Sequence, residues 1–285
     1  MALATVWDTR LSGLAWRLPV ALAALCLVAS SNYVINEVRD APFDVHHPTK
    51  RNRAVPTGLV HVPLAYVQWV TLGVVGCGIA VAVSRPFALA LVALWAMGCI
   101  YNLPPVRTKD RPHLDVLSEA INNPLRLCAG WFAISSSTFP PLTFLLSYWM
   151  VGCYFMAIKR FAEHRDMGAH GVASRYRASF SYYTSQRLLV AIMFYASAAM
   201  LFFGGLIIRY RLELILSFPL VALIMALYLH LAFRPNSPTE HPEKLYRERL
   251  LMILVISCAG LMILLMWVDV PQLRDLVPPS TEVQR

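Results

Sequence analysis

Asparagine and aspartate recur at a helical interval near the start of the chain. Asn36, Asp40 and Asp44 are each four residues apart, so a helix through them would carry all three on one face. Mg²⁺ prefers oxygen ligands and commonly binds one or two carboxylates together with the phosphates of a substrate. We predict that these side chains hold Mg²⁺ and a diphosphate; the alternative is an ordinary solvated helix end. Pro42 lies within the segment and would bend the helix.

Basic side chains follow this acidic segment directly, at Lys50, Arg51 and Arg53. Cations beside acids suit a metal-bound diphosphate, because the acids bind the metal while ammonium and guanidinium groups neutralise the remaining phosphate charge. We therefore predict that Lys50 and Arg53 bind the diphosphate. Simple anchoring of a basic loop at the membrane surface is the alternative.

Two later segments carry further candidates for substrate binding and proton transfer. Tyr101 and Lys109 flank a polar loop, and we assign Tyr101 to substrate binding and Lys109 to catalysis through contact with a phosphate. Lys159 and Glu163 are four residues apart, and Asp166 follows about one helical turn later. We assign all three to catalysis, with Glu163 or Asp166 orienting the acceptor or taking its proton.

A polar stripe crosses the fourth apolar segment of the chain. Asp115, Glu119, Asn122 and Arg126 lie at relative positions 0, 4, 7 and 11, which share one face of a helix. Ionisable groups at membrane depth are costly and usually face a polar cavity. We predict that Asp115, Asn122 and Arg126 line a cavity and bind substrate. The alternative is a set of ion pairs that only joins helices. Pro124 is expected to kink this helix.

The elements that must position these residues are membrane helices. Of 285 residues, 58% are hydrophobic and 14% are charged, whereas soluble domains carry about 25% charged residues. So few charges cannot cover a soluble surface, and lipid must therefore cover part of the protein. Eight apolar runs are long enough to span a bilayer, near residues 18–35, 59–83, 87–103, 116–134, 142–161, 188–208, 212–233 and 250–268. The predicted fold class is all-α, a polytopic membrane bundle of about eight helices around a central cavity.

The distribution of basic residues predicts the orientation of this bundle. Loops after the first, third, fifth and seventh runs hold 17 Lys and Arg residues, and the opposite side holds 7. The positive-inside rule then places the long loops and most polar motifs in the cytoplasm. It also accounts for the net charge of +9, so we expect no nucleic-acid partner. We predict one transmembrane catalytic domain over residues 1–285, with tails of 17 N-terminal and about 16 C-terminal residues.

Residues 36–58 resemble the first signature of the UbiA superfamily of intramembrane prenyltransferases. That signature reads Asn-Asp-x-x-Asp-x-x-x-Asp and continues into a basic stretch that ends in Arg-Pro and a glycine. Asn36, Asp40, Asp44 and Arg53 match it, while glutamate replaces the second-position aspartate and alanine replaces the proline. The resemblance implies Mg²⁺-dependent transfer of a polyprenyl group from a polyprenyl diphosphate to an acceptor. Tyr154, with Tyr33 and Tyr101, is then a candidate to stabilise the allylic cation.

Residues 154–166 depart from the second family signature, because they lack an Asp-x-x-x-Asp pattern. The sequence Lys-Arg-Phe-Ala-Glu in this segment resembles the decaprenyl-phosphate phosphoribosyltransferase branch, as do residues 47–51 and 176–184. That branch implies an alternative reaction, in which phosphoribose passes from phosphoribosyl diphosphate to a polyprenyl phosphate. Arg126 or Lys159 would then hold the lipid phosphate.

The family fold has nine helices and its first signature follows the second helix, whereas here the signature follows the first apolar run. We therefore expect the family's N-terminal helix to be absent from this sequence. Membrane transport is a remote alternative, disfavoured because the acids lie at cytoplasmic helix ends rather than at the midplane. We predict a Mg²⁺-dependent prenyltransferase, integral to a bacterial inner membrane, with a polyprenyl lipid substrate and an active site facing the cytoplasm.

Overall fold

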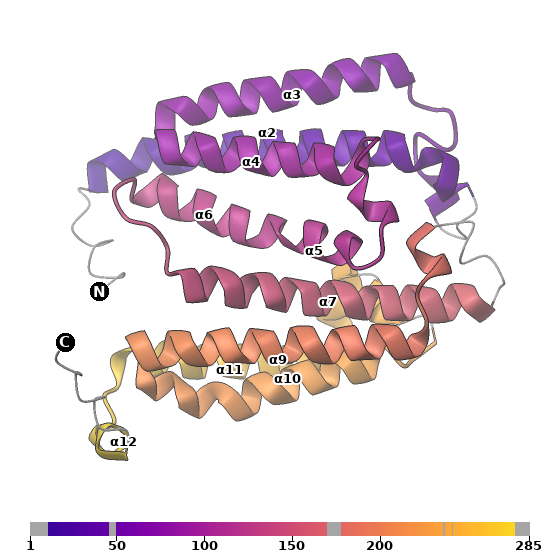
Figure 1. Cartoon of the computed structure of the whole chain (residues 1–285). Coiled ribbons are helices and arrows are strands. Elements are labelled where there is room, and N and C mark those ends of the chain that lie inside the picture. The colour runs from indigo at the N-terminus through magenta and orange to yellow at the C-terminus, as the bar shows by residue number, and fades with distance from the viewer. Residues whose placement is uncertain (1–10, 46–49, 170–177, 236, 241, 277–285) are drawn as a thin grey trace, which may run out of the picture.

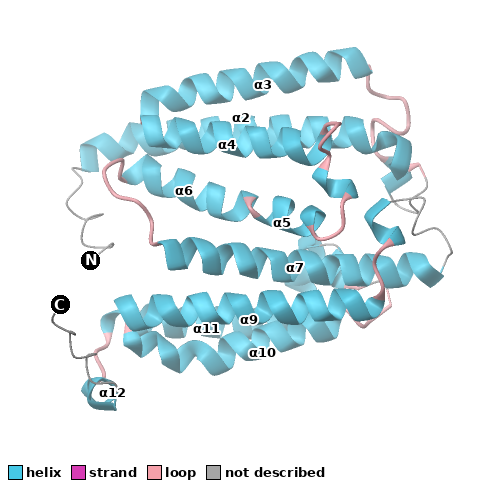
Figure 2. Ribbon diagram, in the orientation of Figure 1, coloured by secondary structure: helices cyan, strands magenta, loops and turns pink. Residues whose placement is uncertain are grey.

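The computed structural model describes residues 11–45, 50–169, 178–235, 237–240 and 242–276. Its long helices run nearly side by side and are joined at alternate ends of the bundle (Figure 1, Figure 2). These described residues form helices, turns and loops but no strand, which confirms the all-α prediction.

One half of the bundle packs around an apolar cluster that includes Ala24, Val28, Leu91 and Ala129. Small residues on one helix allow its neighbours to approach closely, as Gly76 does beneath Val28. The helices of this half are α2 (Leu11–Asp44), α3 (Val62–Val83), α4 (Arg85–Asn102) and α6 (Asn122–Ile134).

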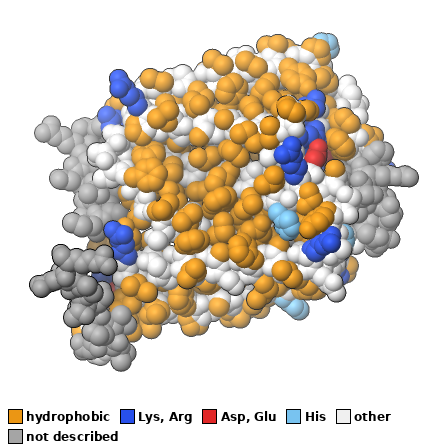
Figure 3. All heavy atoms as spheres, in the orientation of Figure 1, with side chains coloured by type: hydrophobic (Ala, Val, Ile, Leu, Met, Phe, Trp, Pro, Cys, Tyr) orange, Lys and Arg blue, Asp and Glu red, His pale blue; other side chains and the backbone are white. Residues whose placement is uncertain are grey.

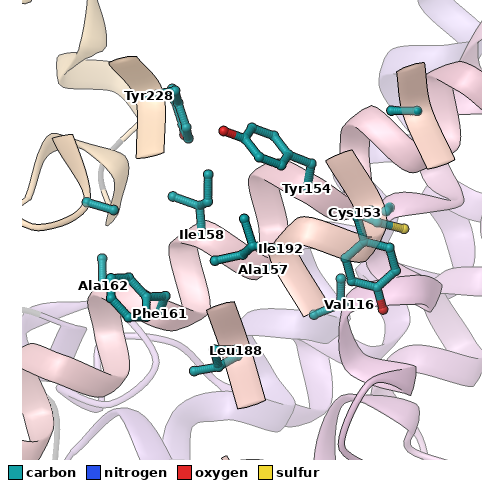
Figure 4. Packing of buried hydrophobic residues seen from close by; sticks show 14 of the residues in the cluster. Val116, Cys153, Tyr154, Ala157, Ile158, Phe161, Ala162, Leu188, Ile192 and Tyr228 are labelled. Carbon is teal, nitrogen blue, oxygen red and sulfur yellow. The ribbon is translucent and has the colours of Figure 1, made fainter. Parts of the chain in front are cut away.

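The other half packs around a second cluster that includes Cys153, Ile158, Phe161 and Leu188 (Figure 4). Its helices are α5 (Leu114–Ala120), α7 (Leu142–Ala169), α9 (Ser185–Tyr210), α10 (Phe218–Leu231) and α11 (Arg249–Trp267). The shorter elements are η1 (Lys50–Asn52), η2 (Thr108–Asp110), η3 (Ala178–Ser181), η4 (Leu212–Ser217), η5 (Pro238–Glu240), η6 (Pro242–Arg247) and α12 (Pro271–Leu276).

Local signals fix where the long helices begin. The Ser84 hydroxyl accepts a hydrogen bond from the Phe87 amide at the start of α4, and it donates to the Phe132 carbonyl at 3.0 Å. Thr184 caps α9 in the same way through the Arg187 amide. α2 begins at Leu11, inside the segment predicted as an N-terminal tail, and continues through Pro42 to Asp44. α12 lies within the predicted C-terminal tail.

Seven helices of the described part are long and apolar enough to cross a membrane. In Figure 3, hydrophobic side chains cover most of the middle of the visible face, while Lys and Arg lie mainly toward its two ends. Such a belt of apolar surface requires lipid as its solvent. The protein is therefore an integral membrane protein.

The fourth predicted span, residues 116–134, is not one continuous helix. It is divided at Ile121 into α5 and α6, each too short to cross a bilayer alone. Pro124 has no amide hydrogen to bond the carbonyl four residues before it, which explains a break at this point. α5 and α6 together run along the bundle beside the seven helices that are long and apolar enough to cross a membrane (Figure 1).

Candidate active site

A polar cavity of about 290 Å³ is lined by residues of α2, α4, α5, α6 and α7 and by Lys50, Arg53 and Lys109 from the segments that follow α2 and α4. Of the predicted site residues, nine line it: Asn36, Asp40, Lys50, Arg53, Tyr101, Lys109, Asn122, Lys159 and Glu163. The remaining lining residues are Ala29, Asn32, Tyr33, Gly98, Asn102, Glu119, Met156 and Arg160. The central cavity expected from sequence is therefore present, near one end of the bundle.

Three oxygen atoms on two helices converge on one ammonium group in this cavity. Lys109 Nζ donates to Asn36 Oδ1 at 3.0 Å, to Asn102 Oδ1 at 3.1 Å and, in a very short contact, to Asp40 Oδ1. The Asn102 amide nitrogen donates to the Gly98 carbonyl at 2.9 Å, which turns its oxygen toward Lys109. We call Asn36, Asp40 and Asn102 the oxygen cage.

Asp44 lies one helical turn beyond the oxygen cage and does not line the cavity. Its buried carboxylate accepts a hydrogen bond at 2.9 Å from Arg53, which does line the cavity. Asp44 therefore acts on the cavity through the placement of Arg53. Arg107 Nη2 lies 3.7 Å from Asp40, so Asp40 faces a second cation besides Lys109.

A buried ion network forms the opposite wall. Arg160 is 2% exposed, and its Nε lies 3.2 Å from Asp115 while its Nη1 lies 2.7 Å from Glu163. Its Nη2 donates to the Tyr101 hydroxyl at 3.4 Å. Lys50 Nζ lies 3.6 Å from the other carboxylate oxygen of Glu163. Buried charges require such pairing, so Arg160 fixes Glu163 and Tyr101 in place.

Asp115 is fully buried behind this wall rather than in the cavity lining, and it connects the network to the chain that precedes α9. The Tyr183 hydroxyl donates to Asp115 Oδ1, and Ser179 Oγ donates to Asp115 Oδ2 at 3.4 Å. The backbone amide of His113 donates to the Tyr183 hydroxyl at 2.7 Å. Burial, and then the negative charge of Asp115, raise the pKa of Tyr183 far above its usual value. Tyr183 thus stays protonated and able to donate.

Two asparagine oxygens in the cavity lining have no hydrogen-bond donor among the described residues. They are Asn32 Oδ1 and Asn122 Oδ1, and both atoms are shielded from solvent. The Asn32 amide nitrogen donates to the Leu94 carbonyl at 2.9 Å, which fixes the orientation of that side chain. Buried acceptors are costly when unpaired, so a ligand with hydrogen-bond donors suits this part of the cavity.

Besides Asp44 and Asp115, three more predicted site residues lie outside the cavity lining. Tyr154 is buried between α7 and α10, where its hydroxyl donates to the Met225 carbonyl (Figure 4). Arg126 is exposed on α6, because the break at Ile121 ends the single helical face on which the predicted stripe depended. Asp166 is half-buried at the end of α7, near Glu240 of η5, and does not line the cavity.

Sequence reasoning missed Asn32, Asn102 and Arg160 as lining residues of the cavity. Asn102 adjoins Tyr101 and Arg160 adjoins Lys159, so these two residues are direct neighbours of predicted ones. In the sequence, Arg160 counts only as one of the basic residues of a cytoplasmic loop. An arginine three residues before a glutamate within an apolar helix was the available signal of a buried ion pair.

The oxygen cage suits Mg²⁺ by the chemistry of its donors. Two amide oxygens and one carboxylate oxygen already converge on a single cation, and hard oxygen donors are those that Mg²⁺ takes. Among the described residues, no group of three or more His, Cys, Asp or Glu side chains is placed to hold a metal ion. A metal bound here would therefore rely on asparagine oxygens and on the phosphates of a substrate.

Comparisons of the sequence and of the fold with known proteins point to one family. Residues 1–255 match the model of the UbiA prenyltransferase family. Decaprenyl-phosphate phosphoribosyltransferase of Mycobacterium tuberculosis is 33% identical over 190 residues, which are 66% of this chain and 60% of that protein. Protoheme IX farnesyltransferase of Pseudomonas syringae pv. syringae is 31% identical over 149 residues, covering 51% of this chain and 50% of that protein.

A UbiA homolog from Archaeoglobus fulgidus, solved bound to DMAPP and Mg²⁺, matches with a TM-score of 0.68 at 16% identity. That match covers 93% of this chain and 91% of the other, so the two share a fold. The matched part of this chain spans about 60% of the length of the phosphoribosyltransferase relatives. Since the family model extends over most of the sequence, the chain belongs to the UbiA prenyltransferase family.

Proposed function

We propose that this family member transfers phosphoribose from phosphoribosyl diphosphate to a polyprenyl phosphate, with Mg²⁺ as cofactor. The observation that carries the proposal is a pair of asparagines, Asn32 and Asn122, that line the cavity and whose buried Oδ1 atoms have no donor among the described residues. Ribose hydroxyls supply such donors, whereas a hydrocarbon chain supplies none. The names of the phosphoribosyltransferase relatives support the same donor.

The charge of the cavity also suits a highly anionic donor. Five cations line it, against three acids. The cations are Lys50, Arg53, Lys109, Lys159 and Arg160, and the acids are Asp40, Glu119 and Glu163. A donor with a diphosphate and a second phosphate brings the negative charge that this surplus attracts.

In the proposed reaction, an oxygen of the lipid phosphate forms a bond to the anomeric carbon of the ribose. The bond from that carbon to the diphosphate breaks, and the diphosphate leaves with the electron pair. Mg²⁺ would stabilise the charge of the leaving diphosphate. Asn36 and Asp40 would hold the metal, while Arg53 and Lys159 would contact phosphate oxygens. Asn32 and Asn122 would orient the ribose, and Glu163, fixed by Arg160, would face the reacting groups.

Prenyl transfer from a polyprenyl diphosphate is the second candidate. Tyr33 and Tyr101 line the cavity and offer aromatic faces that could stabilise an allylic cation. The farnesyltransferase relative supports this reaction by name. Both candidates place a diphosphate at the same oxygen cage, so only the transferred group separates them.

A donor assay on the purified protein tests the proposal. Radiolabelled phosphoribosyl diphosphate is offered with decaprenyl phosphate, and a labelled polyprenyl diphosphate is offered with lipid and aromatic acceptors, each with Mg²⁺ or with EDTA. We expect phosphoribosyl transfer that requires Mg²⁺ and falls by about 10²-fold in Asp40→Asn. Asn122→Leu should raise the KM for phosphoribosyl diphosphate about tenfold. Prenyl transfer without phosphoribosyl transfer would overturn the proposal.

Arg126→Gln serves as the control in this assay. It removes a charge from an exposed position outside the cavity, so we expect activity within about twofold of the unmodified protein. A large loss in this variant would show that the assay reports general damage to the membrane-bound fold.

We also propose that the protein lies in the inner membrane of a bacterium and that its cavity opens toward the cytoplasm. The excess of Lys and Arg in the loops beside the cavity supports this orientation. Two exposed threonines at opposite ends of the bundle can report it. Thr57 lies in the loop between α2 and α3, beside the cavity, and Thr138 lies in the loop between α6 and α7.

Labelling of single introduced cysteines in intact cells tests this orientation. A membrane-impermeant thiol reagent should label Thr138→Cys but not Thr57→Cys, and it should label both variants once the cells are permeabilised. The unmodified protein, with its six native cysteines, gives the background signal. Labelling of Thr57→Cys alone in intact cells would refute the orientation.

A further inference from the structure

The ammonium group of Lys109 occupies the centre of the oxygen cage. Its three oxygen partners come from Asn36, Asp40 and Asn102, and Lys109 is only 3% exposed. An ammonium group has three N–H donors, so it can donate to all three of these oxygens. The cage thus already binds a cation that belongs to the protein itself.

An ammonium and Mg²⁺ cannot occupy this cage together. Mg²⁺ binds oxygen at about 2.1 Å, whereas ammonium hydrogen bonds are near about 2.8–3.0 Å, so the same three oxygens would serve either cation in turn. Two positive centres at such short range also repel strongly in a site shielded from water. A metal ion that enters the cage must therefore displace the Lys109 ammonium.

The displaced ammonium needs a new anionic partner. Asp40 would bind the metal and would no longer pair with Lys109. Arg107 Nη2, 3.7 Å from Asp40, would remain beside it as a second positive charge. A buried ammonium without a partner is costly, so free metal alone displaces Lys109 at a high cost. A metal that arrives with a diphosphate brings the negative charge that can receive the ammonium, and the flexible lysine side chain can reach it.

We propose that Lys109 is the resting occupant of the metal position, and that Asn102 is the third oxygen ligand of that position. On this mechanism the lysine exchanges places with the metal only when a diphosphate is present. Metal and diphosphate therefore bind cooperatively, and each increases the affinity for the other by the same factor. The inference rests on the metal-diphosphate chemistry of the proposed function, and it is independent of which group is transferred.

Binding of Mn²⁺, a spectroscopic substitute for Mg²⁺, tests the inference without turnover. Free Mn²⁺ is counted by electron paramagnetic resonance on the purified full chain, with the solution complex of Mn²⁺ and methylenediphosphonate measured separately. The unmodified protein should bind Mn²⁺ weakly alone and about tenfold more tightly with methylenediphosphonate. Lys109→Met should bind Mn²⁺ alone about tenfold more tightly than the unmodified protein, and methylenediphosphonate should add little.

Lys159→Met is the matched control, because it removes the same charge from the same cavity but does not touch the oxygen cage. We expect its affinity for Mn²⁺ alone to change by less than about threefold. If both lysine variants gained the same affinity for Mn²⁺, the cause would be the loss of one positive charge from the cavity. That result would contradict the exchange of Lys109 with the metal. Unchanged or weaker Mn²⁺ binding in a folded Lys109→Met would do the same.

The unmodified protein provides a measurement that does not depend on the folding of a variant. If it binds Mn²⁺ as tightly without methylenediphosphonate as with it, Lys109 does not compete for the cage and the inference is wrong. Failure of phosphoribosyl transfer in the donor assay, with cooperative Mn²⁺ binding intact, would remove the proposed donor but leave the exchange standing.

Discussion

Arg160 Nη1 lies 2.7 Å from Glu163 Oε2, and the two side chains are only 2% and 3% exposed. The same guanidinium also contacts Asp115 and the Tyr101 hydroxyl, so one arginine joins α4, α5 and α7 at the cavity wall. Buried ion pairs of this kind add little net stability, but loss of one partner leaves the others unpaired. Arg160 is therefore a positioning residue whose removal should harm both folding and catalysis.

Replacement of Arg160 by methionine should lower the free energy of unfolding by about 3–5 kcal/mol, because buried Asp115 loses its ion pair with Arg160 and Glu163 keeps only the longer contact with Lys50. Arg160→Lys should recover part of this stability but not the activity, because a single ammonium cannot contact all three partners. Thermal unfolding in detergent and the donor assay measure the two effects. Full activity in Arg160→Lys would contradict the positioning role.

Gly98→Ala adds a single methyl group but should displace a side chain that lines the cavity. A Cβ atom at this position would lie 2.1 Å from Asn32 Oδ1, so the Asn32 side chain must leave its place and its bond to the Leu94 carbonyl. We expect loss of donor binding, seen as an increase in KM. Gly130→Ala is the matched control, because no neighbouring group of the described residues lies within 4 Å of its Cβ position, and it should retain normal kinetics.

Loss of the side-chain hydroxyl should affect catalysis at Tyr101 but not at Tyr154. The Lys109 ammonium lies over the Tyr101 ring, and the Tyr101 hydroxyl accepts a hydrogen bond from Arg160. Tyr101→Phe removes this hydrogen bond and should lower kcat by about tenfold. Tyr154→Phe removes a bond to the Met225 carbonyl in the core, so it should cost about 1 kcal/mol of stability and leave kcat unchanged. An equal loss of kcat in both variants would contradict this placement of Tyr154.

Stability should depend on pH through Glu240. Burial, and then the neighbouring Asp166, raise the pKa of Glu240 from 4.5 to about 8. The folded protein therefore holds a proton that the unfolded chain has lost, so stability falls as the pH rises from about 4.5 to about 8.

Glu240→Gln mimics the protonated side chain and tests this dependence. We expect its melting temperature to fall less between about pH 5 and pH 8 than that of the unmodified protein, and to exceed it at about pH 8. Melting curves at several pH values in one buffer series provide the measurement. Parallel pH profiles of the two proteins would show that Glu240 does not cause the fall.

The helices and the shared face of Asn36 and Asp40 were predictable because they depend on local sequence. Long apolar runs determine the spans, and the interval of four residues places Asn36 and Asp40 on one face of α2. The approach of Lys109 to that face was not predictable, because it depends on how α4 and η2 pack against α2. Asn102 was missed for the same reason.

Rotation of individual helices decided the remaining assignments. Tyr101 and Tyr154 both lie in apolar helices next to polar segments, yet only Tyr101 faces the cavity. The assignment of Arg126 to the cavity assumed one continuous helix from Asp115 to Arg126. The helix breaks at Ile121, so Arg126 does not share a face with Asp115. Period and composition thus identify which residues can do chemistry, whereas packing between helices decides which of them meet.

The cavity draws all of its described lining residues from between Ala29 and Glu163, and none from α9, α10 or α11. Synthesis proceeds from the N-terminus, so every one of these polar groups is already part of the nascent chain when synthesis of the last three long helices begins. The charges of α2, α4 and α7 can therefore meet one another early, within a half-built protein. A nascent chain of this design need not expose its most hydrophilic surfaces to lipid while it waits for its C-terminal helices.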